Sequence, residues 1–252
     1  MKRTSSRLAA NILVFGAASA SASDLTAEAL VASALDLMRG ATSYVEFTMK
    51  IKRPDWERST SIISWSQGRE DTLIRFTAPA KDAGNALLKV GDNMWTYTPK
   101  LNRTIRLPYS MRAQSWGGSD FSYNDLSRSD QVLRHYDLAI VEETQDGEHT
   151  VYTIEAVPHE NAPVVWGKEI WVLRDDYVML EQVFYDQLQV ALKRMTTLEI
   201  GSMGGRTLAT RMRMERLDKP DHWTEVTTNS AEFDIELSER MFTLFTLRSG
   251  AT

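Results

Sequence analysis

The stretch LLKVGDNMWTYTPKLNRTIRLPYSMRAQSWGGSDFSYND, residues 87–125, carries the features that decide the fold. Its first part alternates apolar and polar residues in three short runs, separated by a Gly-Asp-Asn turn and a Pro-Lys-Leu-Asn turn. Such alternation between turn residues is typical of antiparallel hairpins. From Pro108 onward the alternation stops, and a segment rich in Gly, Ser and aromatic residues follows. Because long irregular connections often carry function, we expect this segment to cover another part of the molecule.

Similar alternation extends through most of the chain in both directions. The other predicted strands span residues 43–53, 59–66, 72–77, 136–143, 149–158, 168–174, 177–185, 187–200, 206–217 and 222–233. Short turns join most of them and no strand–helix–strand alternation occurs, so we predict a mainly β (α+β) fold with one antiparallel sheet. On its long strands we expect one face to be apolar, with Leu192 and Leu198, and the other to be wet, with Lys193 and Glu199.

Two helical segments are available to cover the apolar face of this sheet. The stronger one spans residues 24–39, where Thr26 can cap the helix and Gly40 can end it. Its apolar residues recur on one helical face: Leu30, Val31, Ala34, Leu35 and Met38. A poorer helix is predicted at about residues 122–133, with Ser119 or Asp120 as its cap. A curled sheet of this size is not filled by two helices, so we expect a half-open barrel with a cavity.

The N-terminus has the three-part pattern of an export signal. Lys2, Arg3 and Arg7 precede the apolar run 8–20, and Ala20-Ser21-Ala22 fits a cleavage site. The alternative is an amphipathic or disordered start. We therefore predict a signal peptide at residues 1–22 and a single domain at residues 23–252. The sequence contains no Cys, and export without disulfides favours the bacterial periplasm.

Catalytic and metal-binding motifs were not found. The four His residues are not spaced as ligands, and no zinc-protease, nucleophile-elbow or P-loop pattern is present. The acidic pairs Glu142-Glu143 and Asp175-Asp176 lie at predicted strand ends and turns, where carboxylates are usually solvated. A net charge of −5 argues against nucleic-acid binding. We predict no enzymatic activity, no cofactor and no metal, with an acid/base dyad as a remaining alternative.

The hairpin of residues 94–107 is expected to form an aromatic and aliphatic patch. Pairing Tyr97 with Ile105 and Trp95 with Leu107 would place all four on one face, whereas a shift by one residue would pair the aromatics with Thr104 and Arg106. Ordinary core packing is the alternative role of such a patch. The residues that we expect to line a ligand cavity are Trp95, Tyr97, Ile105, Leu107, Phe76 and Leu88.

The chain resembles the LolA-type periplasmic lipoprotein carriers in Gly91-Asp-Asn-Met-Trp95-Thr-Tyr97-Thr-Pro99 and in Phe76-Thr-Ala-Pro79 one strand earlier. It resembles still more the LolA-like outer-membrane lipoprotein-sorting group, through Gly118-Ser-Asp-Phe-Ser-Tyr-Asn-Asp-Leu126. The resemblance implies a half-open antiparallel barrel, covered by an N-terminal helix and a central helical lid. The residues expected in the lid are Trp116, Gly117, Gly118, Phe121, Tyr123 and Leu126, with a hinge at the two glycines. Arg69 lies near the position of an Arg that helps to hold the lid closed in classical members.

The resemblance also implies a function without cofactor or covalent chemistry. Such a protein would bind the acyl chains of a lipoprotein or another lipid and shuttle them toward the outer membrane. Its expected partners are an inner-membrane transporter as donor and an outer-membrane acceptor, and we expect a monomer. The alternative is a periplasmic lipid- or lipoprotein-sensing module, or an accessory module of an export system, although the known regulators with this fold carry a second domain.

Overall fold

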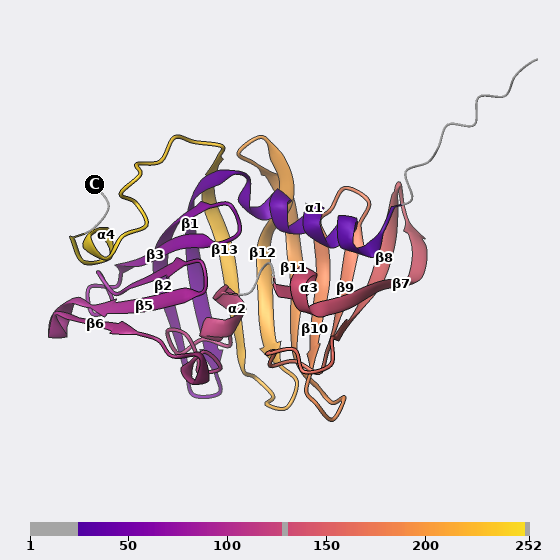
Figure 1. The fold of residues 1–252 in the computed structure, drawn as a ribbon, viewed down its shortest axis with the longest axis horizontal. Coiled ribbons are helices and arrows are strands. Elements are labelled where there is room, and N and C mark those ends of the chain that lie inside the picture. The colour runs from indigo at the N-terminus through magenta and orange to yellow at the C-terminus, as the bar shows by residue number, and fades with distance from the viewer. Residues whose placement is uncertain (1–24, 128–130, 250–252) are drawn as a thin grey trace, which may run out of the picture.

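The strands described by the computed structural model, which covers residues 25–127 and 131–249, form one thirteen-stranded sheet in the order β6-β5-β4-β3-β2-β1-β13-β12-β11-β10-β9-β8-β7 (Figure 1). The strands are β1 Thr42–Arg53, β2 Trp56–Gln67, β3 Asp71–Ala78, β4 Ala86–Val90, β5 Asn93–Thr98, β6 Arg103–Arg106, β7 Tyr136–Asp146, β8 His149–Pro158, β9 Lys168–Arg174, β10 Met179–Tyr185, β11 Ala191–Met203, β12 Arg206–Arg216 and β13 Trp223–Phe233. The predicted signal peptide lies outside the described residues.

All neighbouring strands pair antiparallel, which confirms the predicted sheet. The pairing of β1 with β13, from Ser43↔Phe233 to Lys52↔Trp223, joins the two halves of the chain. β6 and β7 end the sheet without pairing to each other, so the sheet stays open. It is strongly twisted: β5 and β6 run nearly crosswise to β12 and β13 in the view of Figure 1.

The helix α1 (Ala27–Arg39) begins where the sequence predicts a cap. Thr26 Oγ1 accepts a hydrogen bond from the backbone N–H of Ala29 at 3.1 Å. Gly40, with φ +64°, ends the helix in a conformation that a side chain would disfavour. The apolar stripe of α1 packs on β8 and β9, where Leu30 contacts a cluster that contains Ile154 and Leu173. This burial holds the helix on the sheet.

The face of β3 to β5 opposite to this helix layer is covered by the C-terminal segment. That segment contains α4 (Leu244–Ser249), which the sequence pattern did not indicate. Leu247 is fully buried with Leu73 and Leu88. The guanidinium of Arg75 donates hydrogen bonds to the carbonyls of Thr246 at 2.8 Å and Leu247 at 3.1 Å. Both faces of the sheet are therefore buried at this end.

Three expectations about local structure were wrong. Residues 187–190 form a turn instead of the start of a strand, because Asp186 Oδ1 accepts the N–H groups of Leu188 and Val190. Lys193 is buried and not wet, whereas Leu198 is 36% exposed. The ladder between β11 and β12 has register shifts around Glu199, and each shift changes the face on which the following side chains lie.

The predicted helix at 122–133 corresponds to two short helices, α2 (Tyr123–Ser127) and α3 (Gln131–His135). Residues 128–130 between them lie outside the described residues. Single-turn helices η1 (Pro99–Leu101) and η2 (Tyr109–Met111) complete the described helical elements. No helix in the described ranges combines the length and the apolar character needed to cross a membrane.

Truncation of the α1 stripe should destabilise the whole sheet. We expect Leu30→Ala, at a fully buried position, to lower the free energy of unfolding by about 2–5 kcal/mol. Leu25→Ala, at a position that is 42% exposed, is the matched control and should cost less than about 0.5 kcal/mol. Urea unfolding followed by circular dichroism measures both. Equal losses in the two variants would contradict the packing role of the stripe.

Candidate functional site

An irregular stretch, residues 115–126, lies over the apolar face of β1 to β5, and we call it the covering segment. Trp116, which is 4% exposed, packs its ring on Phe76 of β3 with a centroid distance of 5.2 Å. The same cluster contains Met49 and Leu107, with Phe121 at its margin. Phe121 also contacts a second cluster, formed by Trp166, Phe184 and Met214. The covering segment therefore bridges the two halves of the sheet.

Two consecutive glycines let the backbone of this segment approach the sheet closely. Gly117 and Gly118 have φ values of +58° and +76°, where residues with a side chain are strained. A Cβ on Gly117 would also lie 3.1 Å from Cζ of Phe76. The exposed carbonyls are used as acceptors: Arg58 donates to Gly117, and Arg53 donates to Gly118 at 3.0 Å. The hinge expected at these glycines stays a prediction.

A buried carboxylate fixes the middle of the covering segment to the sheet. Asp120 Oδ2 lies 2.9 Å from Nη1 of Arg53 on β1 and accepts a hydrogen bond from Thr224 Oγ1 on β13 at 2.7 Å. The hydroxyl oxygen of Thr224 in turn accepts the backbone N–H of Asp120 at 3.0 Å. The Asp120 and Arg53 side chains are only 4% and 13% exposed. Asp120 is thus a tether and not the helix cap that the sequence suggests.

A second buried ion pair fixes the end of the covering segment. Asp125 Oδ2 lies 2.7 Å from Nζ of Lys193 on β11, and the two side chains are 7% and 8% exposed. The same carboxylate accepts the backbone N–H of Ser122 at 2.7 Å, while Ser122 Oγ accepts the N–H of Asp125 at 3.2 Å. This reciprocal pair caps α2. The Lys193 ammonium also lies 5.1 Å from the ring centroid of Trp166, which compensates part of its lost hydration.

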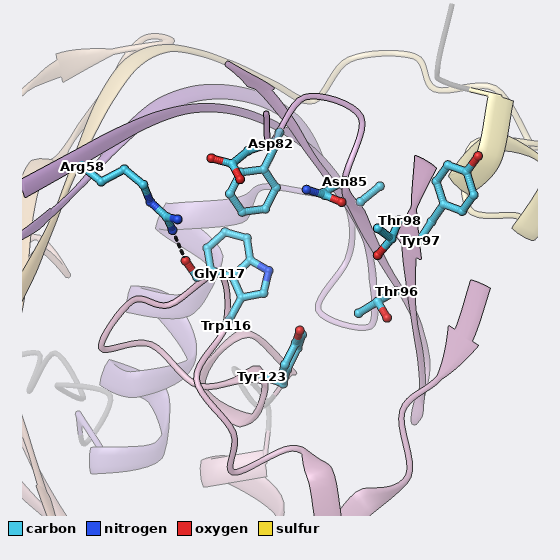
Figure 2. Close-up of a pocket in the computed structure, with 11 residues that line it drawn as sticks. Arg58, Asp82, Asn85, Thr96, Tyr97, Thr98, Trp116, Gly117 and Tyr123 are labelled. Atoms are coloured by element: carbon cyan, nitrogen blue, oxygen red, sulfur yellow. Dashed lines mark hydrogen bonds between the residues drawn. The ribbon is translucent and has the colours of Figure 1, made fainter. Parts of the chain in front are cut away.

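A cavity of about 260 Å³ lies between the covering segment, the 79–85 loop and strands β4 and β5 (Figure 2). Its lining residues are Arg58, Phe76, Asp82, Asn85, Ala86, Thr96, Tyr97, Thr98, Trp116, Gly117 and Tyr123. In Figure 2, Thr96, Thr98 and Asn85 extend from one side and Trp116 and Tyr123 from the other. Burial raises the pKa of the Tyr123 phenol, so this group stays protonated and neutral at physiological pH. The cavity is small compared with ligand pockets of roughly 300–1,000 Å³.

The predicted register of the 94–107 hairpin is wrong by one residue. Trp95 pairs with Arg106 and Tyr97 with Thr104, while Ile105 pairs with Thr96. The turn at residues 99–102, which ends with Asn102 at φ +44°, fixes this register. In this register Trp95 and Tyr97 lie on the face of β5 that the C-terminal segment covers, so that face is not exposed to solvent. An apolar partner on both faces removes the sequence signal that selects a register.

The predicted cavity residues are therefore divided between two faces. Leu88, Trp95 and Tyr97 pack in the cluster that contains Leu247 of α4, and Tyr97 also lines the cavity at its edge. Phe76 and Leu107 lie under the covering segment. Ile105 shares the face of Thr96 and is 39% exposed.

The residues predicted for a lid are found in the covering segment and at its boundary with α2. Trp116, Phe121, Tyr123 and Leu126 all contact the apolar cluster above β1 to β5. Arg69 contacts α1, where it donates to the Asp36 carboxylate at 2.8 and 2.6 Å. Its proposed role in holding a lid stays a prediction. Sequence reasoning missed Arg53, Thr224 and Lys193, because a charged or hydroxyl residue in an alternating strand is normally solvated.

His149, Asp175 and Asp176 come together at the end of the sheet near β7. The His149 and Asp175 side chains are 2.7 Å apart, and one ligand atom of each of the three residues lies within 4.8 Å of the others. A backbone N–H from Thr150 and the His149 side chain lower the pKa of Asp175. Arg174 neutralises Asp176, however, and the His149–Asp175 pair is more than one-third exposed. We interpret the group as a structural turn.

Comparison with known proteins places the chain by family model and by fold. A family described as an uncharacterized protein matches residues 68–249. No curated protein matches the chain. A DUF1329 family protein from Desulfovibrio piger is similar, with 23% identity, a TM-score of 0.79 and coverage of 88% of this chain and 97% of that one.

Two further solved structures share the fold. A putative outer membrane lipoprotein-sorting protein domain from Vibrio parahaemolyticus has 22% identity and a TM-score of 0.76, covering 86% of this chain and 97% of that one. A LolA superfamily protein from Nitrosomonas europaea has 19% identity and a TM-score of 0.72, again with 86% and 97% coverage. The LolA-like fold expected from the sequence motifs is confirmed.

Removal of one partner from the Lys193–Asp125 pair should be costly because it leaves a buried charge. We expect Lys193→Met to lower the free energy of unfolding by about 3–5 kcal/mol. Lys193→Met/Asp125→Asn should recover much of this loss, since neither charge is then buried alone. Urea denaturation of the single and double variants measures the coupling.

Lys168→Met provides the control for this ion pair. Lys168 and Glu155 also form an ion pair, but their side chains are 24% and 35% exposed. Loss of the Lys168–Glu155 pair should lower the free energy of unfolding by at most about 1 kcal/mol. If Lys193→Met were no more destabilising than Lys168→Met, the tether would have no energetic importance.

Proposed function

We propose that the protein is a periplasmic lipid carrier. The premise is that the chain belongs to the family of the matching model, which is described as an uncharacterized protein, and that it has a LolA-like fold. It binds acyl chains of a lipoprotein or another lipid on the apolar face under the covering segment and shuttles them toward the outer membrane. The exported form comprises residues 23–252 as one domain and acts as a monomer. The proposal involves no cofactor and no covalent change of the cargo.

The observation that carries this proposal is an open apolar sheet covered by a segment outside the sheet. Trp116 and Phe121 cover a face formed by side chains such as Met49, Ile62 and Leu107. Acyl chains can replace these contacts, because each CH₂ group removed from water contributes about 0.8 kcal/mol. The affinity for a lipid then comes from the area of the face and needs few polar contacts.

Binding of acyl chains requires the covering segment to move. The cavity of about 260 Å³ beneath it is below the usual size of ligand pockets and has many polar groups on its wall. The tethers favour a reversible movement: Asp120, Arg53, Asp125 and Lys193 regain hydration when the segment leaves the sheet. Because burial of an ion pair gains little net free energy over its hydrated state, opening costs less than its contact distances suggest.

The names of the similar proteins support the choice of cargo. One solved structure is described as an outer membrane lipoprotein-sorting domain and another as a LolA superfamily protein. By analogy we assign an inner-membrane transporter as donor and an outer-membrane component as acceptor. Phe76 and Leu107 line the acyl site in this proposal, with Ile105 at its margin, and the covering segment is its lid.

Bound lipid should be detectable directly. We expect organic extracts of the purified mature chain to contain acyl lipids by mass spectrometry, and the delipidated protein to bind a fluorescent acyl probe. Leu107→Ala should weaken probe binding several-fold, because Leu107 lies under the covering segment. Trp95→Ala, on the opposite face, is the control and should leave binding unchanged. A folded protein that contains no lipid and binds no probe would refute the carrier function.

A further inference from the structure

The wall of the cavity carries five hydrogen-bonding side chains that are not used within the fold. These are Asn85, Thr96, Thr98, Trp116 and Tyr123. None of them makes a side-chain hydrogen bond to a residue in the described ranges. Trp116 is buried and the other four are half-buried, and the five converge on one space from opposite sides (Figure 2). Ligand pockets commonly contain a few polar side chains in this arrangement, and hydrogen bonds to them set the orientation of the ligand.

The charges at the cavity favour a neutral ligand. Arg58 and Asp82 both line it and carry opposite charges. The guanidinium of Arg58 is already bound to the carbonyl of Gly117. Its Nε and Asp82 Oδ2 are buried without a partner among the described residues. A phosphate would meet the carboxylate of Asp82 as well as this one cation, and the repulsion makes a poor anion site.

The remaining groups fit hydroxyls. Asn85 offers both an amide donor and a carbonyl acceptor, the Trp116 indole offers a donor, and the hydroxyls of Thr96, Thr98 and Tyr123 can do either. The aromatic ring of Trp116, tilted against Phe76, supplies an apolar wall beside them. A ligand with several hydroxyl groups on a compact carbon skeleton satisfies both features.

The polar cavity adjoins the apolar face. Phe76 and Trp116 line the cavity and also belong to the apolar cluster under the covering segment. A molecule that occupied both spaces would have a polar end at Thr96 and Tyr123 and an apolar end along the sheet. This is the form of a lipid with its head group in the cavity.

We infer that this cavity is the binding site for a neutral, hydroxyl-rich head group, such as glycerol or a sugar, of the carried lipid. The inference rests on the proposed carrier function and deepens it. The volume of about 260 Å³ suits one head group, whereas the acyl chains take the space that the covering segment vacates. The cavity would thereby select among lipids whose acyl chains bind equally well.

The inference is tested with the full mature chain and three probes that have alkyl or acyl chains of equal length. Monolaurin has a glycerol head group, dodecyl glucoside has a sugar head group, and methyl laurate has neither. Competition against a fluorescent acyl probe gives the relative affinities. We expect at least one hydroxylated probe to bind about ten-fold more tightly than methyl laurate, the effect of one or two net hydrogen bonds.

Variants then assign the preference to the cavity. Thr96→Val and Tyr123→Phe each remove a hydroxyl with little change of shape, and together they should reduce the preference to less than about three-fold. Thr104→Val is the matched control, because Thr104 lies on the neighbouring strand β6 and does not line the cavity. This variant should keep the wild-type preference.

Each outcome has a definite meaning. Stronger binding of monolaurin identifies glycerol as the head group, and stronger binding of dodecyl glucoside identifies a sugar. Equal binding of all three probes to the wild-type chain overturns the head-group site but leaves the carrier function intact. An unchanged preference in the Thr96→Val/Tyr123→Phe variant also overturns the site. If none of the probes binds, both the site and the carrier function are refuted.

Discussion

The structure depends on one physical constraint: an open antiparallel sheet has an apolar face that must be covered. A closed barrel would bury this face by itself, but β6 and β7 remain unpaired with each other. Two different covers meet the constraint. The helix α1 is held over β8 and β9 by side chains that are fully buried, such as Leu30. Over β1 to β5 the cover is an irregular segment tethered through Asp120 and Asp125. The first is held by apolar packing alone, and the second is held by apolar packing together with two buried ion pairs.

The sheet and α1 could be predicted because their signals are local. Alternation between short turns defines the hairpins, and Thr26, the apolar stripe and Gly40 define the helix. The register of β5 and β6 could not be predicted in the same way, because α4 covers a face on which Trp95 and Tyr97 pair with Arg106 and Thr104, two residues that the alternation predicts to be solvated. The tethers were missed for a related reason. Lys193 lies in an alternating strand where a charge indicates water, and only the distant carboxylate of Asp125 explains its burial. Local patterns therefore predicted the elements, whereas contacts between distant segments decided which face each side chain occupies.

The chemistry of the covering segment suits the proposed carrier for amphiphiles. Its apolar side chains occupy the face on which acyl chains would lie in this proposal, and water would replace its ion pairs if it left the sheet. The neighbouring cavity adds polar groups, among them Thr96 and Tyr123, that acyl chains would not use. An apolar surface that gives affinity and a small polar cavity that gives selectivity are together the requirements for recognition of a lipid by both of its ends.

The central claim is that the covering segment must leave the sheet before lipid can bind. A disulfide across the Asp120–Thr224 contact tests it most directly, because the chain contains no Cys of its own. The two side chains are in hydrogen-bond contact at 2.7 Å, so the Asp120→Cys/Thr224→Cys variant brings its two thiols close together. We predict that the oxidised variant does not bind an acyl probe and that reduction restores binding in the same sample. Equal binding by the oxidised and reduced forms would contradict the account.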